Sequence, residues 1–151
     1  MFVVLVERKE LGMRFATVGM KVVIAVVVAL VCGGEVVSAA VPHVVFLIGE
    51  REYKTQETLP EFARDELIGK LKFRCTFVHA DRKDGNRFPG IEAIETADLV
   101  VLSVRRRALP EADLARVRKY LAAGRPLVGV RTASHAFHTK GKHPKGHAEW
   151  Q

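Results

Sequence analysis

The stretch HVVFLIG, residues 43–49, is a continuous apolar run that ends at a glycine. A strand with one face in water alternates apolar and polar side chains, and this run does not alternate. Both of its faces are therefore expected to be buried. Strands buried on both faces are typical of parallel sheets that helices cover on each side.

The apolar pattern that follows has helical spacing and predicts an amphipathic helix of about three turns. Its apolar positions are Leu59, Phe62, Ala63, Leu67 and Leu71. Pro60 suits a first helical turn, and Thr58 with Glu61 has the spacing of a capping box. We therefore expect the helix to begin close to Thr58.

Three further apolar runs are predicted as strands: FRCTFVH at 73–79, DLVVLSV at 98–104 and PLVGV at 126–130. A short helical segment is expected around Ile91 and Ile94, between the first two of these runs. Strands that alternate with helices in this way indicate an α/β fold, and right-handed crossovers would make its sheet parallel.

A second long helix is predicted to follow Pro110, with Gly124 as its C-terminal cap. Its apolar face carries Leu114, Val117 and Leu121. Glycine and proline interrupt the segment after PLVGV too often for it to pack as a helix. The last strand is therefore expected to be a poorly covered edge of the sheet.

Polar segments follow three of the predicted strands, at the carboxyl ends where open parallel sheets bind ligands. They are GEREYKTQ, RRR and RTASHAFH. The side chains expected to line one cleft are Glu50, Glu52, Tyr53, Arg105, Arg107, Arg131 and His135. Carboxylate and imidazole groups transfer protons, and guanidinium groups hold anionic or hydroxyl-rich ligands. Glu52 and His135 are therefore catalytic candidates, and the arginines are substrate-binding candidates.

The turn GVRTA at 129–133 lies where α/β enzymes place a nucleophile on a sharp turn into a helix. The residue at the nucleophile position is Arg131, which cannot attack a substrate. Nucleophilic catalysis is not expected at this turn.

Histidines gather near the end of the sequence, at His135, His138, His143 and His147. Their spacing would suit zinc on a helix. Gly141, Pro144 and Gly146 interrupt any helix there, however, and the neighbouring lysines oppose a divalent cation. We interpret the segment as a solvated loop and predict neither a metal nor a cofactor.

Three segments carry a family resemblance: FLIGEREYKTQETLPEFA, DLVVLSVRRRALP and GRPLVGVRTASHAF. They resemble the ThuA-like (trehalose utilisation) domain family of the class I glutamine amidotransferase-like superfamily. The resemblance covers roughly residues 43–138, and GVRTASHAF is its most specific block. It implies a flavodoxin-like α/β fold and a role in the metabolism of sugars, particularly oxidised disaccharides and glycosides.

The resemblance also implies roles for single residues. The matching positions are Glu52 and Tyr53 after the first strand, Arg105 and Arg107 after the third, and Arg131 and His135 in the fourth-strand block. Glutamine amidotransferases have a cysteine where this chain has Arg131, so glutaminase activity is not implied. Domains of the family continue with further strands, so we expect residues 41–151 to be the N-terminal part of such a domain, an incomplete copy.

The first forty residues have the order of a secretory signal: basic residues, the apolar run VVIAVVVALV, and the small residues SAA at 38–40. A membrane-spanning helix needs about 20 apolar residues, which is more than this run contains. We predict a signal peptide over residues 1–40, for which Met13 is a better-proportioned start than Met1. The alternatives are a core strand and an uncleaved anchor.

The charge pattern does not favour nucleic acid as a partner. The chain has 24 Lys and Arg against 17 Asp and Glu, a net charge of +7, but the basic residues are spread out and do not alternate with aromatic ones. Cys75 is the one cysteine after the leader, so no internal disulfide is expected, and we interpret it as a small buried thiol. The predicted function is an exported protein that acts on or binds a small carbohydrate. The alternative is a non-catalytic carbohydrate-binding or interaction module.

Export makes a prediction about the N-terminus of the mature protein. Because the small residues precede the cleavage point, the periplasmic or extracellular protein should begin at Val41 or Ala40. N-terminal sequencing of the purified soluble protein measures this directly. Soluble mature protein that begins at Met1 or Met13 would contradict the signal-peptide prediction.

Overall fold

A central strand with partners on both sides organises the sheet. The computed structural model describes residues 40–150. Strand β1 (His43–Gly49) pairs in parallel with β2 (Arg74–His79) on one side and with β3 (Leu99–Val104) on the other. The short strand β5 (Leu127–Gly129) pairs in parallel with β3 and gives the order β2-β1-β3-β5. The predicted leader lies outside the described residues, apart from Ala40.

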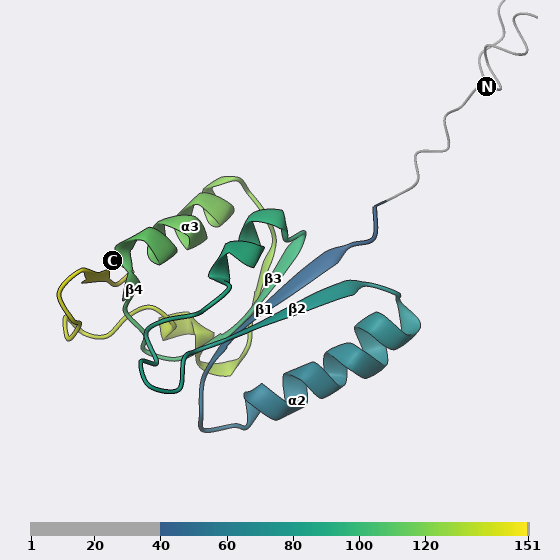
Figure 1. The fold of residues 1–151 in the computed structure, drawn as a ribbon, viewed down its shortest axis with the longest axis horizontal. Coiled ribbons are helices and arrows are strands. Elements are labelled where there is room, and N and C mark those ends of the chain that lie inside the picture. The colour runs from purple at the N-terminus through teal and green to yellow at the C-terminus, as the bar shows by residue number, and fades with distance from the viewer. Residues whose placement is uncertain (1–39, 151) are drawn as a thin grey trace, which may run out of the picture. The chain divides into compact units, whose positions relative to one another are not determined.

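Helical segments cover both faces of this sheet (Figure 1). Helix α2 (Thr55–Phe62) and the π-helical segment η1 (Ala63–Lys70) lie on one face. The 3-10 helix η2 (Ile91–Thr96) and helix α3 (Glu111–Ala122) lie on the other. The arrangement is an α/β fold of the flavodoxin-like type, as the sequence predicts.

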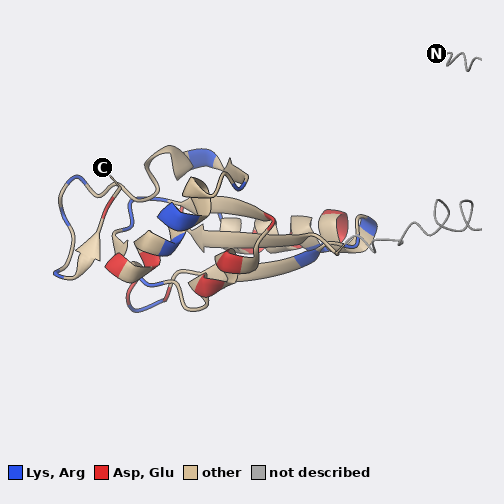
Figure 2. Ribbon diagram, turned by 90° about the horizontal axis from the view of Figure 1, so that it is seen from above, with Lys and Arg blue, Asp and Glu red and all other residues tan. Residues whose placement is uncertain are grey.

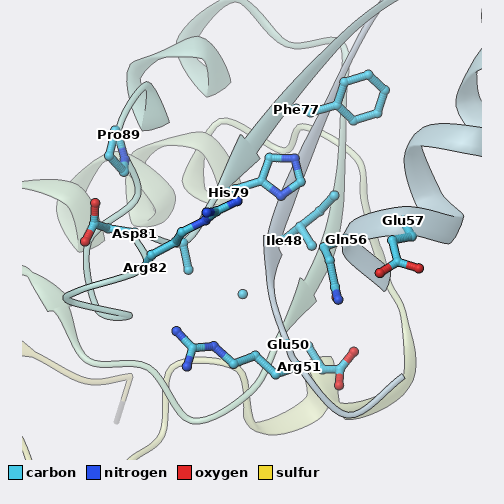
Figure 3. A pocket seen from close by; sticks show the side chains of 12 residues that line it. Ile48, Glu50, Arg51, Gln56, Glu57, Phe77, His79, Asp81, Arg82 and Pro89 are labelled. Atoms are coloured by element: carbon cyan, nitrogen blue, oxygen red, sulfur yellow. The ribbon is translucent and has the colours of Figure 1, made fainter. Parts of the chain in front are cut away.

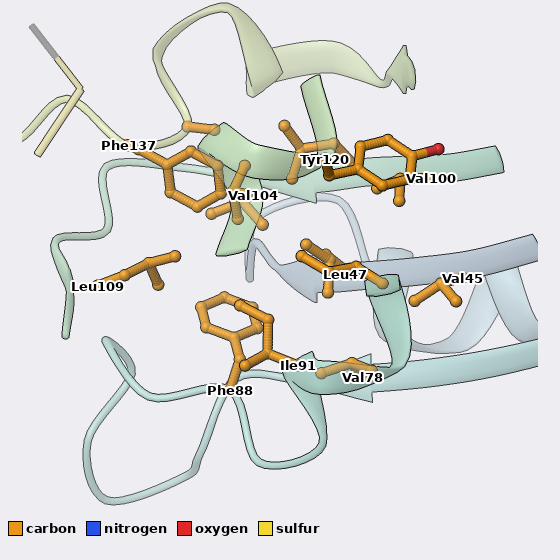
Figure 4. Packing of buried hydrophobic residues seen from close by; sticks show 14 of the residues in the cluster. Val45, Leu47, Val78, Phe88, Ile91, Val100, Val104, Leu109, Tyr120 and Phe137 are labelled. Atoms are coloured by element: carbon orange, nitrogen blue, oxygen red, sulfur yellow. The ribbon is translucent and has the colours of Figure 1, made fainter. Parts of the chain in front are cut away.

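The alternation of side chains along β1 feeds two separate apolar cores. All seven residues of β1 are buried. Val45 and Leu47 point to the α3 side, where they join a cluster that includes Val78, Phe88 and Phe137 (Figure 4). The side chains of β1 that point to the α2 side are Val44, Phe46 and Ile48. Burial on both faces explains why this run has no polar alternation.

The predicted capping box is wrong. Helix α2 begins at Thr55, not near Thr58, and its N-terminal flank is Lys54 in the left-handed conformation with φ 53°. No side chain caps the helix. Pro60 lies inside the helix, where it supplies no N–H to the hydrogen-bond ladder. The helical segment continues past it as the π-helical turns of η1.

The second helix and the edge strand agree better with the predictions. Helix α3 follows Pro110, buries Leu114 and Val117, and is followed by Gly124 at φ 69°. Its buried face also includes Tyr120, whose hydroxyl donates to the Pro126 carbonyl at 2.7 Å.

Cys75, in β2, is only partly buried, and this burial raises the pKa of its thiol.

The segment after β5 folds back on the domain more than its sequence suggests. Phe137 is buried in the α3-side core, so one face of β5 is covered even without a long helix. Strand β6 (His147–Ala148) pairs antiparallel with β4 (Leu109–Pro110). Glu149, directly after β6, holds the loop between Phe137 and β6. Its carboxylate accepts hydrogen bonds from the Thr139 N–H and hydroxyl, each at 2.6 Å, and from the Gly141 N–H at 2.9 Å. These bonds hold the pKa of Glu149 below its usual range and keep the loop closed.

Within residues 40–150, no helix is both long enough and apolar enough to cross a lipid bilayer.

The outer face of β5 is the exposed edge that the sequence predicts. Val128 is 49% exposed there, and within residues 40–150 β5 pairs with no strand other than β3. An exposed apolar edge pairs with edges of other chains, and a lysine on it opposes such pairing. We expect Val128→Lys to lower self-association at high protein concentration, measured by light scattering. Val41→Lys is the matched control, because Val41 is 58% exposed but lies outside the sheet. An equal effect of both substitutions would assign the change to net charge and not to the edge.

Candidate functional site

A buried carboxylate controls how the chain leaves the central strand. Glu50 follows β1 directly and is 3% exposed. One of its oxygens accepts the N–H groups of Glu52 and of Tyr53, the latter at 2.8 Å. The other accepts the Thr55 hydroxyl at 3.0 Å, and Ser103 of β3 donates in turn to Thr55 at 3.0 Å. Each Glu50 oxygen is therefore used to shape the loop between β1 and α2.

This loop presents Glu52 and Tyr53 to the loops that follow the other strands. Arg105, just after β3, forms an ion pair with Glu52. The guanidinium of Arg131, just after β5, stacks 4.2 Å from the centre of the Tyr53 ring. Such cation–π contacts contribute roughly 0.5–1 kcal/mol at exposed sites. Two side-chain contacts thus join three loops at the carboxyl ends of the parallel strands.

Arg107 is held by main-chain groups. Its Nε donates to the Gly49 carbonyl at 3.1 Å. A Cβ at Gly85 would lie 2.6 Å from one of its terminal nitrogens, so the guanidinium packs closely against the main chain at Gly85. Burial lowers the pKa of Arg107, and the positive charge of Arg51 lowers it further. Two guanidinium groups are therefore close enough to repel each other.

The turn after β5 has the geometry of a nucleophile elbow with an arginine in the nucleophile position. Arg131 has φ 55°, a left-handed conformation that costs a non-glycine residue free energy. A Cβ at Gly129 would lie 3.1 Å from that of Ala133, so small residues on both sides permit the sharp turn. The chain goes directly from β5 into the 3-10 helix η3 (Arg131–His135).

The loops after β1 and β3 border an open cleft of 310 Å³, which we call the arginine cleft. It is lined by Gly49, Glu50, Arg51, Glu52, Arg105, Arg106 and Arg107. The cleft opens between the carboxyl ends of β1 and β3. From β1 the strand order first runs outward to β2 on one side of β1 and then resumes with β3 on its other side. The cleft between β1 and β3 is therefore at the topological switch point, where such folds bind ligands. Figure 2 shows Lys and Arg on loops beyond this end of the strands.

A larger hollow adjoins the arginine cleft on the β2 side and shares Glu50 and Arg51 with it (Figure 3). This β2-side hollow has a volume of 1070 Å³. Its lining includes His79 at the end of β2, with Asp81 and Arg82 just beyond. The cleft predicted from the sequence does not include the loop after β2. A histidine and charged residues directly after a strand were the available signal.

The structure places His135 apart from the other predicted site residues. Its side chain lines a mainly apolar hollow next to α3, together with Val117, Phe137 and Trp150. Neither the arginine cleft nor the β2-side hollow includes His135 in its lining. Its carbonyl accepts the Arg106 N–H at 3.2 Å, so its main chain supports the cleft while its ring faces elsewhere. Of the other predicted site residues, Glu50, Glu52, Arg105 and Arg107 line the arginine cleft. Tyr53 and Arg131 contact each other and are not part of its lining.

The histidine segment forms a folded loop held by Glu149. Within residues 40–150, no three His, Cys, Asp or Glu side chains group closely enough to hold a metal ion. His138 lies 4.0 Å from a Glu149 oxygen. The ring nitrogens of His143 and His147 lie near main-chain carbonyls of the same loop.

Comparison of the chain with protein-family models, with curated proteins and with solved structures gives no match. The ThuA-like resemblance therefore rests on the sequence segments alone.

The Glu50 network generates a prediction about stability. Glu50→Gln would replace the oxygen that accepts the Thr55 hydroxyl by an NH2 group, which only donates. The Thr55 hydroxyl already accepts a hydrogen bond from Ser103, so its own proton would lose its acceptor. An unsatisfied buried polar group costs about 1–3 kcal/mol. We expect a loss of this size in the free energy of unfolding, measured by urea denaturation. Glu57→Gln, the same change at an exposed position on α2, should alter it by less than about 0.5 kcal/mol. Equal midpoints for the two variants would show that Glu50 does not organise the loop.

Proposed function

We propose that the protein is an exported ThuA-like domain that binds a sugar or a glycoside in the arginine cleft. The observation that carries the proposal is the gathering of Arg105, Arg107 and the Glu52 carboxylate at the switch point of the sheet. Guanidinium forks and a carboxylate provide the donors and acceptors that hydroxyl-rich ligands need. A volume of 310 Å³ lies at the lower end of the range of about 300–1000 Å³ for ligand pockets.

The stacked pair of Tyr53 and Arg131 supplies the apolar element of such a site. Tyr53 is 41% exposed, although aromatic rings are usually buried or paired. Arg131 covers it and holds it beside the cleft. An exposed ring next to polar groups suits the apolar face of a sugar ring. A ligand that contacts Tyr53 would also contact the loops after β1 and β5.

Proton transfer, if the domain is an enzyme, falls to Glu52 and not to Glu50. The Glu50 oxygens are occupied by main-chain and hydroxyl donors. The side chain of Glu52 is 50% exposed and its partner Arg105 is 38% exposed, so a ligand can reach both. The placement of His135 in a different hollow favours the second candidate, a carbohydrate-binding module without catalysis.

The proposal is tested by calorimetry and by turnover on a panel of oxidised and unoxidised disaccharides. A charged hydrogen bond contributes about 1.5–3 kcal/mol, so Arg105→Gln should weaken sugar binding about tenfold or more. Arg116→Gln is a closely matched control, because Arg116 pairs with Glu95 at nearly the same exposure, 39% and 52%. It should bind sugar like the unchanged protein.

The outcomes separate the two candidate functions. Turnover that His135→Ala abolishes would support an enzyme that uses the arginine cleft together with the apolar hollow that contains His135. Binding without turnover would support the module. Absence of binding to every sugar in the panel, with the protein folded, would contradict both.

A further inference from the structure

The β2-side hollow contains cationic groups that the sugar proposal does not use. Arg51, in the loop after β1, lines one wall of the hollow, and Arg82 lies beside His79 on the opposite wall (Figure 3). Within residues 40–150, no ion pair involves either arginine. Both are exposed, so their charges are available to a ligand from solvent.

The carboxylates of the same hollow are mostly occupied by the protein itself. Glu50 is saturated by the loop after β1. Asp81 accepts the N–H groups of Lys83 and Asp84, each at 2.8 Å, and these bonds lower its pKa. Glu57, at the start of α2, is the remaining carboxylate of the lining. Two of the three carboxylates therefore already accept hydrogen bonds from the protein, whereas neither guanidinium group forms an ion pair within residues 40–150.

The loop after β2 is built to keep its shape without a ligand. Asp81 closes the turn from one end, and its own N–H donates to the Arg87 carbonyl at 2.8 Å. The Asn86 side chain accepts the Ala108 N–H at 3.1 Å, which ties this loop to the one that carries Arg107. The main chain at Arg82 is thus held relative to the arginine cleft. Binding an anion then requires ordering of the Arg82 side chain but not of its loop, which lowers the entropy cost.

We propose that the β2-side hollow binds the anionic group of the ligand, a carboxylate or a phosphate, through Arg51 and Arg82, with His79 as an additional hydrogen-bond donor. This inference rests on the proposed function, because Arg51 lines both cavities and one ligand would extend across it. The substrate class is then a sugar acid or a sugar phosphate, with its hydroxyl groups in the arginine cleft and its charged end in the β2-side hollow.

The test compares matched pairs of ligands by calorimetry: lactose with lactobionate, and glucose with glucose 6-phosphate. At least one anionic partner should bind about tenfold tighter than its neutral partner, since it gains a charge-assisted hydrogen bond. The stronger pair identifies the carboxylate or the phosphate as the group recognised. The preference should shrink as salt is added, because both arginines are exposed to solvent.

Variants assign the preference to the hollow. Arg82→Gln should reduce the ratio of anionic to neutral affinity while the neutral sugar binds as before, because Arg82 does not line the arginine cleft. Arg51→Gln should also reduce this ratio, and the double variant should bring it close to one; the ratio is compared because Arg51 lines both cavities and its loss can also weaken neutral-sugar binding. Lys83→Gln removes the same charge from the neighbouring exposed residue, which does not line the hollow, and should leave the ratio unchanged.

Failure of this inference is distinguishable from failure of the proposed function. Equal binding of the neutral and anionic partners, or a preference that survives in the double variant, would overturn the anionic subsite and leave sugar binding intact. Binding of inorganic phosphate that Arg82→Gln abolishes, with no binding of lactose or glucose, would support the subsite and overturn the sugar proposal. Absence of binding to all of these ligands would overturn both.

Discussion

The hydrogen bonds to the buried Glu50 carboxylate determine the shape of the carboxyl edge. A buried carboxylate is costly unless donors surround it, and Glu50 finds them in the next few residues of its own loop. Main-chain N–H groups that bond backward to Glu50 force the chain to turn sharply after β1. The turn places Lys54 in the left-handed conformation and begins α2 at Thr55. It also directs Glu52 outward, where Arg105 of the loop after β3 forms an ion pair with it.

The loops after β3 and β5 form a second unit that the main chain holds together. The N–H groups of Arg106 and Arg107 donate to the carbonyls of His135 and Ala136, the latter pair at 2.7 Å. Arg106 itself has φ 48°, so this unit carries backbone strain that its hydrogen bonds offset. Carboxylates and main-chain groups thus supply the framework of the edge. Guanidinium groups are the part of it left to meet a ligand, which is why both proposals concern oxygen-rich or anionic chemistry.

The strands were predictable because their apolar runs are long and local. The bounds of β1 agree with the prediction at both ends, and those of β2, β3 and β5 differ by no more than one residue at either end. The two-residue strands β4 and β6 were not predicted, and β6 lies in the segment interpreted as a solvated loop. The start of α2 was not predictable from local pattern. Thr58 and Glu61 have capping-box spacing, but Thr55 is drawn to Glu50 and to Ser103 of another strand. A contact across 48 residues outweighed a local motif.

The sequence by itself determined the α/β class, the strands buried on both faces, and the gathering of polar residues at strand ends, because hydrophobic periodicity and position after a strand are local properties. It also indicated Glu52, Tyr53, Arg105, Arg107 and Arg131. Only the tertiary structure decided which of these groups face one another. It separated His135 from them and added Arg82, whose loop was not among the three polar segments predicted to line the cleft. Strand order is the physical reason: β2 pairs beside β1 and brings its loop next to Arg51, and such pairing depends on contacts between residues far apart in the chain.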